Sequence, residues 1–332
     1  MASRVLVTGG TGFLGRAIVE RLVADGAEVK ALARSAASAG MLNALGATSV
    51  RGDVLDSEAL AAATRGCDLL YHLAGVNRFC LRDPSQMFEA NVEGSRRVVR
   101  AASRAGVPRV VYTSSAATLG EARGTVGTET TSHRGRFLSS YERSKFEAER
   151  AVLASARETG IEVVCVNPAS VQGPGRAAGS AGLLLDYLNG KLKVVVDSQL
   201  SLVDIADCTE GHLLAAARGT PGERYVLSGA TLTVREGLAL MARLAGVDRP
   251  VRTIPPWLAF ASATAAEALA LIRRDTPRVC RELVRTLIHG HAYDGSKATR
   301  ELGLRYTPVE ETLRRTIDWW VEQGLVARPG LA

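Results

Sequence analysis

Residues 8–15 read Thr-Gly-Gly-Thr-Gly-Phe-Leu-Gly and stand between a short apolar run and an amphipathic stretch. A glycine-rich turn between a strand and a helix is the setting of a dinucleotide-binding loop. Gly9 would permit the tight turn, Gly12 would let a pyrophosphate approach the backbone, and Gly15 would let the helix pack closely on the sheet. Gly10 also satisfies the first position of the pattern, so the sequence leaves the starting glycine open.

Outward from this turn, short apolar runs alternate with stretches of helical period. The runs are apolar on successive residues, as expected for strands of a parallel sheet that is covered by helices on both faces. We therefore predict an α/β fold: a Rossmann-type, doubly wound parallel sheet with a smaller, mostly helical substrate-binding domain. The predicted strands are residues 5–7, 28–32, 69–73, 110–113 and 163–166, and a helix over 13–23 follows the first of them.

The pattern changes after Pro168, where glycines interrupt the chain and strand-like runs become rare. Residues 222–227 nevertheless have the pattern of one more strand, so the first domain is expected to regain chain after the second has begun. We predict a Rossmann domain of residues 1–172 plus about 200–230, and a substrate-binding domain of about 173–199 plus 231–332.

Composition narrows the function classes. The net charge of +7 does not indicate nucleic-acid binding, because the basic residues are scattered among acids. Five dispersed cysteines without a CxxC pair predict neither a disulfide nor a zinc site, and together with the lack of a signal peptide they favour a reducing, cytoplasmic location. The apolar stretch 257–272 is shorter than the about 20 residues that span a bilayer. It is expected to be a covering helix, with membrane-surface contact as the alternative.

The expected partners are a small-molecule substrate and, as an option, a second copy of the chain in a homodimer. No nucleic acid and no stable membrane insertion are expected.

The second predicted strand ends at Arg34, where an acid would bind the ribose 2′-hydroxyl of NAD. An arginine there favours the 2′-phosphate of NADP, so we predict NADP(H) as the preferred cofactor and NAD(H) as possible. A merely solvated Arg34 is the alternative. Asp53 is placed to accept from the adenine amino group, with an N-cap-like loop acid as its alternative. Phe13, Leu14 and Val54 adjoin these positions and are counted with the cofactor site.

A second group of polar residues carries the predicted chemistry. Ser114 and Ser115 end a predicted strand, at the edge where open α/β sheets bind ligands. Tyr141 and Lys145 lie one turn apart in a helical pattern. A phenol with an ordinary pKa of about 10 is a poor acid or base at neutral pH, but an adjacent ammonium would lower that pKa toward the working range. A serine hydroxyl could then orient the substrate oxygen.

Together these motifs resemble the extended short-chain dehydrogenase/reductase family, also described as the NAD-dependent epimerase/dehydratase family. Within it the chain is most similar to the dihydroflavonol-4-reductase-like branch, including proteins named hopanoid-associated sugar epimerases. The resemblance covers nearly the whole chain. The motifs that carry it are TGGTGFLG at 8–15, GDV at 52–54, HLAG at 72–75, NVEG at 91–94, TSSA at 113–116, YERSK at 141–145 and VNPASVQGPG at 166–175.

The resemblance implies a role for each matching residue. For the cofactor these are Gly9, Gly12 and Gly15 at the pyrophosphate, Arg34 at the 2′-phosphate, Asp53 at the adenine, Ala74 beside the ribose, and residues 167–170, with Pro168 and Ser170, against the nicotinamide. For catalysis they are Asn91 supporting a water chain, Ser115 binding the carbonyl, Tyr141 carrying the proton, and Lys145 holding the nicotinamide ribose while biasing Tyr141.

The histidines are predicted to have no catalytic role. His72 and His212 lie in apolar patterns and are expected in the core, while His289 and His291 are expected to form no metal set with a nearby carboxylate. No metal is assigned.

We therefore predict an NADP(H)-dependent oxidoreductase that reduces a ketone or aldehyde, or oxidises a secondary alcohol, with Tyr141 as proton donor or acceptor. A sugar or nucleotide-sugar epimerase that retains its nicotinamide is one alternative, and a non-catalytic NADP-sensing module is another. Apolar segments at 183–187, 194–196 and 255–260 are expected to roof the nicotinamide, which favours an apolar or weakly polar substrate. Packing of these segments against the sheet is the alternative.

Overall fold

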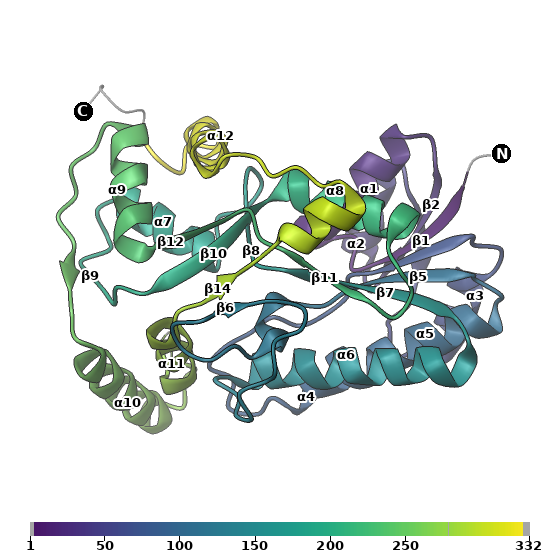
Figure 1. Ribbon diagram of the computed structural model, residues 1–332, viewed down its shortest axis with the longest axis horizontal. Coiled ribbons are helices and arrows are strands. Elements are labelled where there is room, and N and C mark those ends of the chain that lie inside the picture. The colour runs from purple at the N-terminus through teal and green to yellow at the C-terminus, as the bar shows by residue number, and fades with distance from the viewer. Residues whose placement is uncertain (1–2, 278, 328–332) are drawn as a thin grey trace.

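The central feature of the chain is a seven-stranded parallel sheet, seen in a computed structural model that describes residues 3–277 and 279–327 (Figure 1). From β1 the chain winds outward through β2 and β3, then crosses back to β4 on the other side of β1. This reversal is the switch point of a doubly wound sheet. In spatial order the strands are β11 (Arg224–Leu227), β7 (Glu162–Pro168), β5 (Arg109–Thr113), β4 (Leu69–His72), β1 (Arg4–Thr8), β2 (Glu28–Ala33) and β3 (Thr48–Arg51).

Helices cover both faces of this sheet, which explains why its strands are apolar on successive residues. In β1, Val5, Leu6 and Val7 are all buried, and Val5 and Leu6 contribute to different core clusters. One face is covered by α1 (Phe13–Ala24), α2 (Ala36–Ala44) and α8 (Ile205–Arg218), and the other by α3 (Ser57–Thr64), α5 (Gly94–Arg104) and α6 (Ser140–Thr159).

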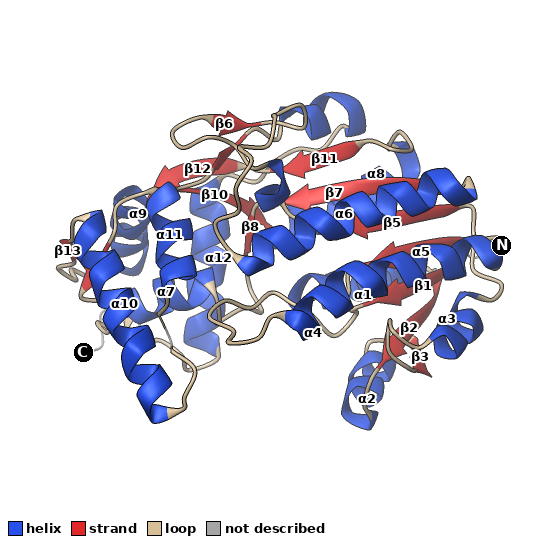
Figure 2. Ribbon diagram, turned by 90° about the horizontal axis from the view of Figure 1, so that it is seen from below, coloured by secondary structure: helices blue, strands red, loops and turns tan. Residues whose placement is uncertain are grey.

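The second part of the molecule lies beyond the carboxyl ends of the strands (Figures 1 and 2). Its own core contains the fully buried Trp320, whose indole donates to the backbone oxygen of Arg176 at 2.9 Å. This core joins α7 (Ser180–Leu188), α9 (Val234–Ala245) and α12 (Val309–Glu322). A smaller cluster joins α10 (Pro256–Arg273) and α11 (Arg281–His289).

Short strands and single turns connect the two parts. A three-stranded sheet contains β12 (Ala230–Thr233), β10 (Gln199–Asp204) and β8 (Ser170–Gln172), and two-stranded sheets pair β13 (Arg252–Thr253) with β9 (Val194–Val195) and β14 (Ala292–Tyr293) with β6 (Val126–Gly127). The remaining elements are α4 (Ser85–Phe88), π-helical turns at Glu89–Glu93 and Ala298–Leu302, and a 3-10 turn at Ala116–Leu119.

The structure confirms the predicted α/β class and every predicted strand of the central sheet, including β11, which pairs in parallel with β7. Two stretches of the second part pack in a way that the sequence did not indicate. Ala298, Leu302 and Leu304, from the region assigned to the second domain, pack in the core of the Rossmann sheet. The stretch 257–272 forms α10 but is not a covering helix, because most of its surface is exposed.

The apolar segments that were predicted to roof the nicotinamide also differ from expectation. Tyr187 and Val195 are buried in the core of the second part, where they pack with other apolar residues of that part. The packing alternative therefore holds for these two side chains. Among the helices of residues 3–277 and 279–327, none has both the length and the hydropathy to cross a membrane.

Candidate active site

The glycine turn between β1 and α1 has a geometry that only glycine satisfies. Gly9 has φ 76°, and a Cβ built on it would lie 2.6 Å from the backbone nitrogen of Ala74. A Cβ on Gly15 would collide with the backbone oxygen of Gly9. Gly10 has no positive φ and faces the side chains of Leu42 and Val19 instead. The structure thus places the start of the pattern at Gly9, which the sequence left open.

The same turn is suited to an anion. Gly12 is the N-cap of α1, and within the described chain no side chain caps the amide groups of the first turn. Free amides at a helix N-terminus bind phosphate groups. A Cβ on Gly12 would lie 3.3 Å from the oxygen of Gly9 and would narrow this cradle. The turn therefore fits the pyrophosphate of a dinucleotide, with the half-buried Phe13 and Leu14 beside it.

The ends of β2 and β3 bring together the two residues predicted at the adenosine. The Arg34 side chain is 79% exposed, and its Nε lies 3.9 Å from Oδ2 of Asp53. Oδ1 of Asp53 accepts from the backbone nitrogen of Leu55 at 3.0 Å, so this acid also stabilises its own loop. Val54 is buried and packs against Gly94 of α5, where a Cβ would lie 2.7 Å from Val54 Cγ2.

Beyond β4, Ala74 passes close to the glycine turn and His72 is part of the core. Nδ1 of His72 bonds the Thr8 hydroxyl at 2.6 Å and Nε2 bonds the Ser95 hydroxyl at 2.9 Å. Burial lowers the pKa of His72 to about 3, helped by the charge of Lys145. A neutral, doubly bonded imidazole is a structural residue, as predicted. His212 is equally buried and bonds Thr113 and the oxygen of Cys208.

Helix α6 and the turn after β5 place Tyr141 next to Ser115. Ser139, the residue before α6, caps the helix by accepting from the backbone nitrogen of Glu142 at 3.1 Å, which fixes the start of the helix at Ser140. Burial raises the pKa of Tyr141, and the neighbouring Ser115 hydroxyl and the Arg176 charge partly oppose that shift. The phenol is therefore protonated at neutral pH.

Lys145 does not act on Tyr141 as predicted. Its ammonium donates to Tyr112 Oη at 3.1 Å and to the backbone oxygen of Thr113 at 2.9 Å. Burial lowers the pKa of Lys145 to about 8, while the charge of Glu149 opposes the shift. The expectation that this ammonium lowers the pKa of Tyr141 is wrong for this geometry. Both hydrogen-bond partners of the Lys145 ammonium come from strand β5. Burial of the Tyr141 phenol outweighs the effect of the nearby polar groups on its pKa.

Asn91 lies in the π-helical turn at Glu89–Glu93, a kind of distortion that is frequent at functional sites. Its amide accepts from Val76 N at 2.7 Å and donates to Val76 O at 3.0 Å and to Ser144 Oγ at 2.9 Å. A Cβ on Gly75 would lie 3.3 Å from Oδ1 of Asn91 and 3.8 Å from Nζ of Lys145. Asn91 thus joins the loop after β4 to the helix that carries Tyr141.

The segment after β7 shows where the remaining predicted residues lie. Pro168 ends β7, and the Ser170 hydroxyl bonds the Ser180 hydroxyl at 2.8 Å. Ser114 donates its backbone nitrogen to Val166 O at 2.7 Å, and its buried hydroxyl has no partner among the described residues. Because Ser115 rather than Ser114 lies beside the Tyr141 phenol, the geometry favours Ser115 as the hydroxyl of the site.

Arg176 is the site residue that the sequence did not identify. Its guanidinium donates to Val171 O at 2.7 Å, lies 5.7 Å from the centre of the Phe13 ring, and faces Tyr141 closely enough to influence its pKa. Burial lowers the pKa of Arg176 itself. The signal for it was its place just after Gly-Pro-Gly at 173–175, but only the fold brings that loop to Phe13 and Tyr141.

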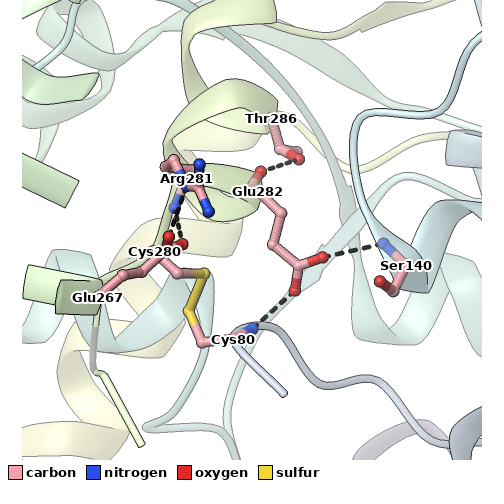
Figure 3. Close-up of a disulfide and its surroundings, with 7 residues drawn as sticks. All are labelled: Cys80, Ser140, Glu267, Cys280, Arg281, Glu282 and Thr286. Carbon is pink, nitrogen blue, oxygen red and sulfur yellow. Dashed lines mark hydrogen bonds and ion pairs between the residues drawn. A yellow bond between two sulfur atoms is a disulfide. The ribbon is translucent and has the colours of Figure 1, made fainter. Parts of the chain in front are cut away.

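A disulfide joins this site to the second part, which contradicts the prediction that the cysteines form none (Figure 3). Cys80, in the loop after β4, is bonded to Cys280, the N-cap of α11. The carboxylate of Glu282 accepts from the backbone nitrogens of Cys80 at 2.7 Å and Ser140 at 3.0 Å. The spacing of 200 residues hid the pair from sequence reasoning. Because two of the five cysteines form a disulfide, the cysteines no longer support the prediction of a reducing compartment.

These contacts tie α11 to the two segments that flank Tyr141, at Ser140 and in the loop that carries Phe79. Ser140 precedes Tyr141, and the ring of Phe79 lies 5.9 Å from the ring of Tyr141. Glu282 and the disulfide thus hold two active-site segments from one helix of the second part.

A second correction concerns His289 and His291, which do lie beside a carboxylate. Nδ1 of His291 is 2.6 Å from Oε1 of Glu121, and Nε2 of His289 is 3.7 Å from the same oxygen. Burial raises the pKa of Glu121, but hydrogen bonds from the two histidines outweigh it and lower the pKa to about 2. Sequence spacing could not reveal this group, because Glu121 comes from another domain. The ligand atoms of these three residues lie within 4.8 Å of one another, and the lack of a metal stays a prediction.

Residues 5–228 match the model of a family described as "NAD dependent epimerase/dehydratase family". A protein of Synechocystis sp. with a provisional dihydroflavonol 4-reductase name is 32% identical over 98% of this chain and 97% of its own. A 4-hydroxy-2-methyl-3-oxo-4-farnesyl-3,4-dihydroquinoline-1-oxide ketoreductase of Stigmatella aurantiaca is 35% identical over 90% of this chain and 91% of its own. Among solved structures, UDP-glucose 4-epimerase of Thermus thermophilus in complex with NAD superposes with a TM-score of 0.76, at 26% identity over 96% of this chain and 98% of that one.

Proposed function

Because the chain belongs to the NAD-dependent epimerase/dehydratase family and is an NAD(P)-dependent oxidoreductase of the extended short-chain type, we propose that it is an NADPH-dependent ketoreductase with Tyr141 as proton donor. The observation that carries the proposal is the meeting of Ser115 and Tyr141 at the carboxyl edge of the sheet, where the glycine turn also lies. Ligands of open α/β sheets bind at this edge.

The residues divide the reductive step between them. A nicotinamide dinucleotide held at the turn of Gly9, Gly12 and Gly15 would supply the hydride for the carbonyl carbon. Ser115 donates a hydrogen bond to the carbonyl oxygen and holds it against Tyr141. As the carbon–oxygen double bond opens, the O–H bond of Tyr141 breaks and its proton passes to the oxygen, which leaves an alcohol. The raised pKa of Tyr141 supports this direction, since the phenol is present in its donating form at neutral pH.

Lys145 and Asn91 keep this geometry in place. The ammonium of Lys145 is held by Tyr112 and Thr113 at the end of β5, from where it would donate to the ribose of a bound nicotinamide. Asn91 fixes the loop after β4 against α6.

The preference for NADPH rests on the end of β2. Arg34 is exposed and lies 3.9 Å from its nearest acid, so its guanidinium is free to form a bidentate contact with a 2′-phosphate. An acid that would accept from a ribose hydroxyl is absent from that position in the sequence.

The proposed substrate is an apolar or weakly polar ketone. The half-buried ring of Phe79 lies against Tyr141, and the ring of Phe13 lies 5.7 Å from the Arg176 guanidinium that faces Tyr141. The name of the Stigmatella aurantiaca relative specifies a 3-oxo compound with a farnesyl group, which supports an apolar class.

The decisive experiment is a substrate panel with purified protein. Apolar ketones and aldehydes are assayed by NADPH absorbance, and nucleotide sugars by product chromatography. We expect NADPH oxidation with the apolar carbonyls and loss of that oxidation in Tyr141→Phe. Conversion of the sugars alone would overturn the proposal.

One observation favours a second candidate, a redox-neutral sugar epimerase. The guanidinium of Arg176 is placed beside Tyr141, where it could bind an anionic group of a nucleotide sugar. An epimerase must retain its nicotinamide between turnovers, so protein that holds the cofactor through purification and interconverts sugars without added NADPH would favour this function over reduction.

A further inference from the structure

Helix α10 has an unusual surface for a helix on the outside of a protein. Among residues 256–272 the sole charged side chain is Glu267. That carboxylate is already used, because it accepts from the backbone nitrogen of Arg281 at 2.7 Å and forms an ion pair with its guanidinium at 2.5 Å. No charge is therefore left to solvate the outer face of the helix between its ends.

Only a narrow stripe of small residues attaches α10 to the rest of the molecule. Ala259, Ala263 and Ala270 are buried, and the cluster that contains the first two is completed by Val284 of α11. Both views place α10 at the outer margin of the second part, with α11 between it and the remaining elements (Figures 1 and 2). The opposite face is thus left without a partner within the described chain.

The large apolar residues of α10 occupy that free face. Trp257 is 70% exposed, Leu271 71% and Ile272 80%. Leu258, Phe260 and Leu269 are also exposed. At about 100° per residue these six side chains spread over roughly half of the helix circumference. An exposed apolar surface of this extent marks an interaction site.

Basic residues adjoin the apolar face at both ends. Arg273 and Arg274 are exposed directly after Ile272, and Arg252 is exposed in the strand that precedes the helix. Asp275 is the acid in the adjoining turn. An apolar face with a tryptophan and flanking arginines is the pattern of helices that lie in the interface of a membrane, where arginines meet anionic headgroups.

The C-terminal end of α10 is also linked to the active site. Arg82, in the loop that follows β4, donates to the backbone oxygens of Ala270 at 2.8 Å and Asp275 at 2.7 Å. The same loop carries Phe79, which lies against Tyr141. This loop therefore links the C-terminal end of α10 to the Tyr141 site.

We propose that α10 is a membrane-surface anchor: it lies in the plane of an anionic phospholipid surface, with Trp257, Leu271 and Ile272 in the boundary between headgroups and acyl chains. The charge complementarity of Arg252, Arg273 and Arg274 favours a phospholipid surface over a second copy of this chain, which carries a net charge of +7 and would bring like charges together. The proposal concerns binding alone and does not depend on the proposed reaction.

The test is flotation of the full chain with lipid vesicles, of phosphatidylcholine alone and of phosphatidylcholine with about one third phosphatidylglycerol. We expect binding to the mixed vesicles, weakened by salt, and an increase in Trp fluorescence that Trp257→Phe removes. A variant with Trp257→Ser, Leu271→Ser and Ile272→Ser should lose at least about tenfold in vesicle affinity. Arg273→Gln with Arg274→Gln should reduce the difference between the two vesicle types.

Controls separate this reading from loss of fold and from dimerisation. Met41→Ser changes an exposed apolar residue on α2 and should leave vesicle binding unaltered. NADPH binding and circular dichroism report whether the serine variants are folded. Equal vesicle binding by the triple serine variant, or binding to neither vesicle type, would overturn the proposal. So would a wild-type dimer in sedimentation velocity that becomes monomeric in the triple variant without any vesicle binding.

Discussion

The disulfide between Cys80 and Cys280 should contribute measurably to stability. The bond closes a loop with a sequence separation of 200 residues. In the chain-entropy model such a loop corresponds to about 5 kcal/mol of unfolding free energy, and measured disulfides commonly give about 2–4 kcal/mol. For 332 residues the entropy of unfolding is about 0.7 kcal/mol per kelvin, so a contribution of about 2–5 kcal/mol raises the melting temperature by about 3–7 °C.

The assay compares melting temperatures of the wild type and Cys80→Ser, each with and without a thiol reductant, while mass spectrometry counts free thiols. The reductant should lower the melting temperature of the wild type by the amount above and leave that of Cys80→Ser unchanged. Cys67→Ser, at a buried cysteine outside the bond, is the matched control and should keep the response to reductant. Five free thiols in non-reduced protein, or an equal response in both proteins, would refute the reasoning.

Further predictions concern the site. Tyr141→Phe should lower turnover by at least about a hundredfold with NADPH affinity preserved, and near-normal rates would reassign the proton donor. The proposed role of Lys145 requires its ammonium form, and its pKa is lowered to about 8, so kcat/KM should fall as the pH rises through about 8. Lys145→Arg should move this alkaline decrease in kcat/KM to higher pH. A decrease that stays at the same pH in the variant would mean that another group titrates there. Arg34→Ala should reduce the preference for NADPH over NADH by about 1–2 kcal/mol in titration calorimetry, and an unchanged preference would place the 2′-phosphate elsewhere. Glu282→Gln should lower kcat without changing NADPH affinity, because it loosens the Ser140 end of α6; unchanged kcat would leave Glu282 a purely structural role.

The sequence predicted those features that depend on neighbours along the chain. The strands of the sheet and the turn at residues 8–15 follow from local hydrophobic pattern and glycine spacing, and they agree with the structure. Tyr141 and Lys145 were found because they lie one turn apart on one helix. For these two residues the sequence predicted only that they lie close together. The hydrogen-bond partners of Lys145 come from β5, so the effect of Lys145 on Tyr141 could not be derived from their spacing.

Features that depend on distant segments were missed. Arg176 faces Tyr141 only because the loop after β8 folds over Phe13, and Cys80 meets Cys280 only because α11 returns to the loop after β4. The surface of α10 was misjudged for a different reason. Its apolar composition predicts burial, and sequence alone does not show that its contacts with α11 and the adjoining loops leave the outer face uncovered.

The position of β11 in the sheet has a consequence for biosynthesis. Strand β7 ends at Pro168, but its outer partner begins at Arg224, so a growing chain leaves the ribosome with β7 as an open edge until roughly fifty more residues have followed. At about 5–20 residues per second that interval lasts a few seconds, during which a strand with an apolar centre at residues 163–166 offers unpaired backbone groups to other chains. The nascent protein is then most in need of a chaperone, and a messenger truncated before the codon for Arg224 would yield a product that keeps this edge permanently open.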